Sequence, residues 1–129
     1  MGKTIIEAID ELRLDYGPFD AVTFETPPYV RNLVTSCLIW HVMGAITGWA
    51  SGQGYPIWDI RPTELKRHCC RVVGREWHNK YQPKKSEIAV AVALAFPDTP
   101  ADVPRSDHAD DAALVADAYF RSRQFKNSG

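Results

Sequence analysis

Residues 106–111 carry the densest group of side chains that could do chemistry. They hold three aspartates and a histidine directly before a small apolar run at residues 112–116: Asp107, His108, Asp110 and Asp111. On a helix, positions three or four apart share a face, which pairs His108 with Asp111 and Asp107 with Asp110 or Asp111. One or two aspartates here would only complement the helix dipole. Three of them with a histidine, beside an apolar face, predict a metal site.

A second acidic side chain, Glu25, follows a short β-prone run at residues 21–24. It is either a solvated strand-end residue or a further metal ligand. Glu25, His108 and Asp111 together would form a hard-cation site, since oxygen-rich ligation favours Mg²⁺ and one imidazole is well tolerated by Mn²⁺. The spacing leaves open whether the helix supplies His108 and Asp111 or Asp107 and Asp110.

The three cysteines raise the alternative of a zinc site, but no pair has the Cys-x-x-Cys spacing. Cys69 and Cys70 are adjacent and cannot easily share one tetrahedral centre. The cysteines also make no disulfide framework, and no signal peptide is recognisable, so we expect a cytoplasmic protein.

Charge is unevenly distributed along the 129 residues, although the net charge is −1. Residues 61–85 contain eight basic side chains against two acidic ones, whereas residues 1–28 and 98–117 are acidic. Such a basic segment is either an ordinary solvated surface or a face that binds phosphates.

These residues must be positioned by helices and strands that the pattern predicts. Helical spacing covers residues 4–15, 33–50, 86–96 and 107–120, and short strands are expected at 21–24 and 56–60. Thr63 is a plausible N-cap of a basic helix running to about Arg71, and Ser106 of the last helix. Residues 73–82 are expected to form a loop. The order of helices and strands predicts a single α/β domain.

The segment 33–50 has no formally charged residue and carries Trp40 and Trp49. Its length reaches the threshold for a membrane span, but its polar residues and the absence of a basic flank argue against one. A core helix or a dimer helix is expected, because Gly44 and Gly48 would let a second helix approach closely. No membrane partner is predicted.

The ordered set of these motifs resembles the RuvC family of Holliday-junction resolvases over nearly the whole chain. The matching residues are Glu25-Thr-Pro-Pro-Tyr29, Asn32, Gly44, Pro62-Thr-Glu-Leu-Lys66, Val73-Gly74, Lys84-Lys85-Ser-Glu-Ile-Ala-Val and Asp107-His-Ala-Asp-Asp-Ala112. The resemblance implies a ribonuclease H-like fold with a mixed sheet flanked by helices. It also implies a Mg²⁺-dependent, structure-selective endonuclease that resolves four-way DNA junctions by paired nicks, acting in recombination and repair.

The resemblance further assigns roles by position. Glu25, His108 and Asp111 would hold the metal, with Asp107 as the competing choice. Lys85 would lie near the scissile phosphate, next to Lys84. The other DNA contacts would be Tyr29 at the crossover and Lys66 and Arg67 on the backbone. The helix from Asn32 to Ala50 would form the homodimer interface.

The family's first strand, with an aspartate in a Gly-x-Asp-x-Gly context, has no counterpart in this sequence. We therefore expect a domain that lacks the N-terminal hairpin and one of its four metal ligands. Two alternatives follow: a non-catalytic relative that binds branched DNA, or a ribonuclease H-fold nuclease acting on another nucleic acid.

Overall fold

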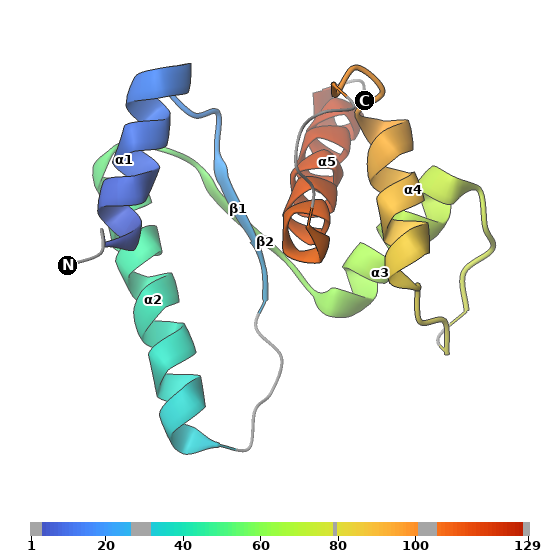
Figure 1. Ribbon diagram of the computed structural model, residues 1–129, viewed down its shortest axis with the longest axis horizontal. Coiled ribbons are helices and arrows are strands. Elements are labelled where there is room, and N and C mark those ends of the chain that lie inside the picture. The colour runs from blue at the N-terminus through green and yellow to red at the C-terminus, as the bar shows by residue number, and fades with distance from the viewer. Residues whose placement is uncertain (1–3, 27–31, 79, 101–105, 128–129) are drawn as a thin grey trace. The chain divides into compact units, whose positions relative to one another are not determined.

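The computed structural model describes residues 4–26, 32–78, 80–100 and 106–127. Its element order is α1 (Ile5–Tyr16), β1 (Val22–Glu25), α2 (Leu33–Gly52), β2 (Ile57–Ile60), α3 (Pro62–Val73), α4 (Lys85–Ala95) and α5 (Asp107–Asn127) (Figure 1). The helix and strand types predicted from the sequence are therefore all confirmed. The chain divides into two compact units, Met1–Val22 with Pro27–Trp58, and Thr23–Thr26 with Asp59–Gly129.

The two strands pair in parallel. The amide of Val22 donates to the carbonyl of Pro56 over 2.9 Å, and the amide of Thr26 to that of Ile60 over 2.8 Å, so the register advances equally on both strands. The Thr26 hydroxyl donates to the Asp59 carboxylate over 3.0 Å. Parallel pairing sets the carboxyl ends of β1 and β2 side by side, and this brings Glu25 to the edge from which α3 departs.

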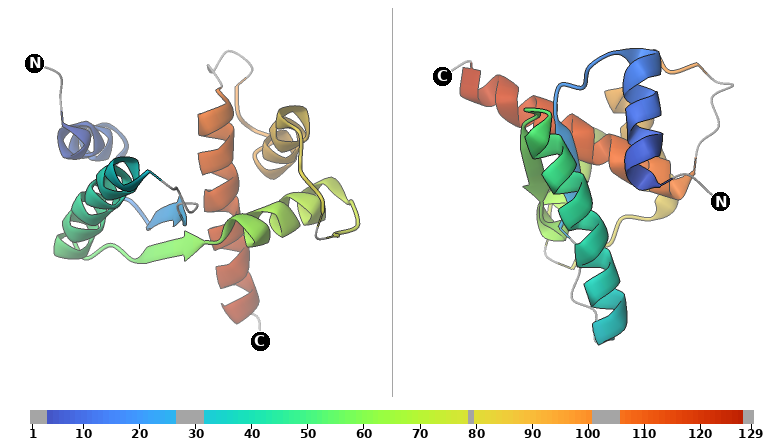
Figure 2. Two further views of the ribbon diagram at one scale, coloured as in Figure 1. Left: turned by 90° about the horizontal axis from the view of Figure 1, so that it is seen from below. Right: turned by 90° about the vertical axis from the view of Figure 1, so that its left-hand side faces the viewer.

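In the first unit, α1 and α2 lie next to one another (Figure 1; Figure 2, left). The rings of Phe19, Trp49 and Tyr55 pack together, with centroids 5.7 to 6.3 Å apart. Ala50 is the only buried residue of α2 among those described. The expectation that α2 is a core helix of this chain is thus wrong, because most of its apolar side chains face outward.

In the second unit, α3, α4 and α5 pack on one another, and α5 crosses α3 (Figure 2, left). The core is formed by side chains from β2, the loop after α3 and all three helices: Ile60, Leu65, Cys69, Cys70, Tyr81, Ala91, Val92, Leu114, Val115, Ala118 and Tyr119.

Two predicted helix boundaries need correction. Arg61, not Thr63, is the N-cap of α3, because Pro62 occupies the first helical position, where its missing N–H costs nothing. The last helix continues to Asn127 rather than ending at Phe120. The Arg121 side chain donates to Asp117 and that of Arg123 to Tyr119, each four residues back, and these bonds support the additional turns.

Candidate functional site

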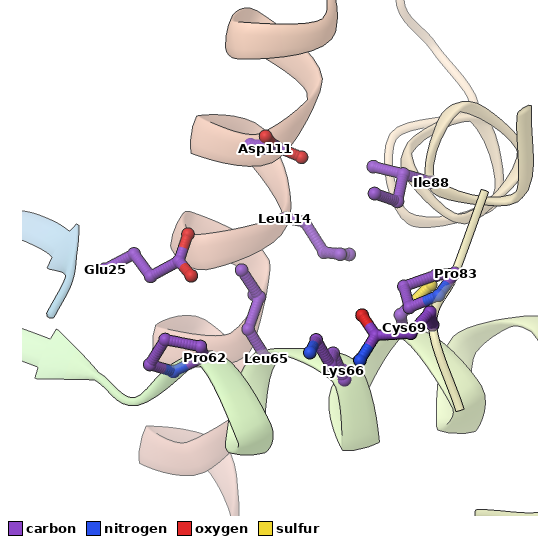
Figure 3. Close-up of a pocket in the computed structure, with 10 residues that line it drawn as sticks. Glu25, Pro62, Leu65, Lys66, Cys69, Pro83, Ile88, Asp111 and Leu114 are labelled. Atoms are coloured by element: carbon purple, nitrogen blue, oxygen red, sulfur yellow. The ribbon is translucent and has the colours of Figure 1, made fainter. Parts of the chain in front are cut away.

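A pocket of about 180 Å³ in the second unit brings together Glu25 and Asp111, two of the acidic residues predicted from the sequence (Figure 3). Glu25 reaches it from the end of β1, Lys66 from α3 and Asp111 from α5. The rest of its wall is mostly apolar: Pro62, Leu65, Cys69, Gln82, Pro83, Ile88 and Leu114. Such walls hold back water and strengthen electrostatic interactions in the pocket.

Glu25 and Asp111 face the same pocket, although they are 86 positions apart in the sequence. Partial burial raises the pKa of Glu25, and the nearby charge of Asp111 raises it further. Partial burial also raises the pKa of Asp111, as do the charges of Asp107 and Asp110. Because the ionised form of each carboxylate is disfavoured by burial and by neighbouring negative charge, a cation bound between them would be stabilised.

Lys66 brings a positive charge into this pocket. Its ammonium group opposes the two effects that raise the pKa of Glu25. From the sequence we expected Lys66 to contact the DNA backbone, together with Arg67. The structure places the half-buried Lys66 among the pocket residues, one position before the exposed Arg67, and the contact of both with DNA stays a prediction.

The other acidic residues of α5 lie around the pocket rather than in its wall. Asp107 is ion-paired with Lys85 over 3.0 Å. Asp110 is buried and lines a smaller cavity of about 60 Å³, together with Lys85, Ile88, Asp107 and Asp111. His108 is exposed and lines neither cavity, but its charge lowers the pKa of Asp111.

The donor set suits a hard divalent cation held by few protein ligands. Among the described residues, no three His, Cys, Asp or Glu side chains are grouped closely enough to hold a metal ion. Mg²⁺ is commonly bound through one or two carboxylates, with water and substrate phosphate completing its shell. The Glu25–Asp111 pair therefore fits Mg²⁺, or Mn²⁺, and it fits zinc poorly.

Three of the predicted DNA contacts, Arg67, Lys84 and Lys85, belong to the same unit as the pocket. The Arg67 guanidinium lies over the Trp77 ring, 5.3 Å from its centroid. Lys84 is the exposed N-cap of α4, and Lys85 is the exposed first residue of that helix. Tyr29 lies outside the described residues.

Two groups of interacting side chains were not predicted from the sequence. Arg75 lies 4.5 Å from the centroid of the Tyr81 ring and donates to Glu87 over 3.0 Å, and the Tyr81 hydroxyl also donates to Glu87. These contacts fix the course of the predicted loop, and nothing in the sequence signals them.

The second missed group is His68 with Asp117, which form a buried hydrogen bond. The sequence did contain a signal that His68 is buried. His68 lies on the apolar face of α3, three residues after Leu65 and next to Cys69.

Comparisons with known proteins show the fold. No protein-family model matches the chain, and no curated protein sequence matches it. Among solved structures, the chain is similar to RuvC of T. thermophilus in complex with a Holliday junction substrate, with 20% sequence identity and a TM-score of 0.66. The match covers 92% of this chain and 65% of that one, so this chain spans just under two thirds of that relative's length. The arrangement of its helices and small parallel sheet is thus similar to that of RuvC.

Proposed function

We propose that this protein is a divalent-cation-dependent nuclease that resolves four-way DNA junctions. The observation that carries the proposal is the convergence of Glu25, Asp111 and Lys66 on one pocket of a fold similar to RuvC. Two carboxylates for a cation and an ammonium group for a phosphate are the parts that phosphodiester hydrolysis needs.

Each side chain has a separate part in this proposal. Glu25 and Asp111 would hold Mg²⁺, whereas His108 is exposed outside their pocket and acts on Asp111 only through its charge. A cation bound there supplies the Lewis acidity that polarises a phosphodiester. Lys66 attracts the phosphate into the pocket, and Lys85 offers a second positive charge from the start of α4. Leu65, Ile88 and Leu114 exclude bulk water from one side of the pocket.

Paired nicking requires two sites, and we propose that a homodimer formed through α2 supplies them. Exposed apolar side chains line this helix; Leu33, Leu38 and Trp40 are 76%, 63% and 58% exposed. By length and composition alone, Leu33–Gly52 could also cross a membrane. A two-fold axis through α2 would relate the two pockets by the symmetry that a four-way junction presents.

The test is cleavage of an immobile four-way junction by the purified 129-residue chain in Mg²⁺, Mn²⁺ or EDTA. We expect paired nicks in opposite strands with either metal and none in EDTA, and no cleavage of linear duplex of the same sequence. Glu25→Gln and Asp111→Asn should abolish the nicks.

Two other results would replace the proposal. Selective junction binding without nicks in any metal would indicate a non-catalytic protein that binds branched DNA. Metal-dependent cleavage of an RNA–DNA hybrid or a single strand, in preference to the junction, would indicate another nuclease of this fold.

A further inference from the structure

A buried hydrogen bond joins α3 to α5, two helices that line the pocket. His68 Nε2 lies 2.7 Å from Asp117 Oδ2, and the two residues are 4% and 7% exposed. A carboxylate only accepts, so Nε2 carries the proton and donates it. The Arg121 side chain donates to the same oxygen over 3.1 Å from the solvent side. Asp117 therefore accepts from the His68 ring on its buried side and from the Arg121 side chain on its solvent side.

The two bonded residues belong to the helices that build the pocket wall. His68 follows Lys66 by two positions on α3, between the pocket residues Leu65 and Cys69. Asp117 follows the pocket residue Leu114 by three positions on α5, which places both on one face of that helix. A shift of α3 along α5 would break this bond and would also move Lys66 relative to Asp111.

Apolar contacts alone would define this helix register poorly. Leu65, Cys69, Leu114 and Ala118 would tolerate sliding by a fraction of a turn, because hydrophobic burial has no direction. A hydrogen bond between buried groups does have a direction, and leaving its members unpaired is costly. The bond therefore selects one register out of several that would bury similar apolar area.

We propose that His68 and Asp117 are positioning residues, which fix α3 against α5 and thereby hold Lys66 opposite Asp111 across the pocket. This inference rests on the proposed nuclease function for its consequence in catalysis. The structural part of the inference is that the Lys66–Asp111 geometry depends on the buried bond, and this part does not rest on the proposed function.

The test uses the full chain with His68→Leu, His68→Gln and Asp117→Asn. Leucine fills the site without a donor, whereas the glutamine amide can still donate to Asp117. Cys70→Ala is the matched control, because Cys70 is equally buried on α3 but lines no described pocket and takes no part in the bond. Circular dichroism establishes that each variant is folded at the assay temperature.

For the folded variants we expect His68→Leu to slow single-turnover junction cleavage by about 10²-fold, the usual effect of misplacing a catalytic group by about 1 Å. Junction affinity should stay unchanged. His68→Gln should restore most of the rate, and Cys70→Ala should retain it. A purely structural role predicts instead that folded His68→Leu cleaves at the wild-type rate, and that result overturns the inference.

Backbone NMR of the metal-free protein provides a readout that does not require activity. The amide resonances of Lys66 and Asp111 should shift in His68→Leu and return in His68→Gln. If they stay in place in folded His68→Leu, the inference fails, whether or not the protein cleaves DNA. If instead the wild-type chain cleaves nothing while these resonances move as expected, the proposed function fails and the positioning role stands.

Discussion

The ammonium group of Lys85 lies 3.0 Å from the carboxylate of Asp107, so the first residue of α4 is joined to the first residue of α5. Both side chains are largely exposed, and such a pair adds little to stability. The contact matters for the proposed function, because Lys85 is the lysine that we assign to the DNA phosphate. In the absence of DNA, Asp107 occupies its ammonium group. Asp107 is thus engaged by a cation of the chain itself, whereas Asp111 faces Glu25 in the pocket.

The acidic residues are expected to differ in importance according to this placement. Glu25→Gln and Asp111→Asn should each abolish Mg²⁺-dependent junction cleavage, with binding nearly intact, and His108→Ala should slow cleavage less because His108 lies outside the pocket. Asp107→Asn should retain cleavage, because it removes only the partner of Lys85. Rates under single-turnover conditions decide this. An inactive Asp107→Asn together with an active His108→Ala would show that Asp107 and Asp110 are the ligands supplied by α5.

Magnesium should stabilise the fold through the same pair. A ligand that binds only the folded state at ten times its Kd raises the free energy of unfolding by about 1.4 kcal/mol. We expect the melting temperature to rise by about 4 °C in the wild type and in Asp107→Asn. Glu25→Gln and Asp111→Asn should show no rise. If the melting temperature still rises with Mg²⁺ in both Glu25→Gln and Asp111→Asn, the cation binds elsewhere.

The basic residues of α3 should carry part of the salt dependence of DNA binding. Lys66→Ala and Arg67→Ala should weaken binding to junction and duplex alike, and should each reduce the slope of log K against log salt by about 0.9. Because Lys66 lies in the pocket, its loss should also slow cleavage more than that of Arg67. Arg13→Ala is the control, since Arg13 is paired with Asp10 on α1. Unchanged slopes would show that the basic segment 61–85 is an ordinary solvated surface that does not bind DNA phosphates.

The proposed dimer interface on α2 can be tested with substitutions that do not strain the single chain. A Cβ atom built on Gly44 or Gly48 meets nothing within 4 Å, so leucine there is tolerated by one copy alone. Gly44→Leu or Gly48→Leu should nevertheless yield monomers or aggregates, because a close partner helix has no room for the side chain. Sedimentation measures the mass, and Gly52→Leu, at the end of α2, is the control. A monomeric wild type, or one that floats with lipid vesicles, would contradict the dimer.

Stability should depend on pH through His68. Burial lowers its pKa below the usual value of 6.5; the charges of Arg71 and Arg121 act in the same direction, and Asp117 opposes them. Protonation is therefore easier in the unfolded chain, and stability is lost as the pH falls from above 6.5 toward the lowered pKa. Thermal unfolding from pH 7.5 downward should show this loss in the wild type, and His68→Gln should flatten it. An identical pH dependence in both would exclude His68 as the source.

Much of the fold could be predicted from the chain itself. Helical spacing indicated α1, α2, α4 and α5, a helix start signal indicated α3, and Thr4 and Ser106 cap their helices as such residues do. The strand ending at Glu25 was also correct, because β-prone residues followed by two prolines leave few alternatives. These elements can be identified from the sequence because their periodicity and their start and stop signals depend on residues that are neighbours in the chain.

The sequence by itself determined which residues could do chemistry: the carboxylates Glu25, Asp107, Asp110 and Asp111 and the lysines near them. Only the tertiary structure decided which of them meet. The crossing of α3 and α5 at the end of β1 brings Glu25, Lys66 and Asp111 into one pocket and leaves Asp107 with Lys85. The His68–Asp117 bond spans 49 positions, and no local pattern predicts such a contact. Pairings of this kind depend on how helices dock, which is fixed by the whole core rather than by neighbouring residues.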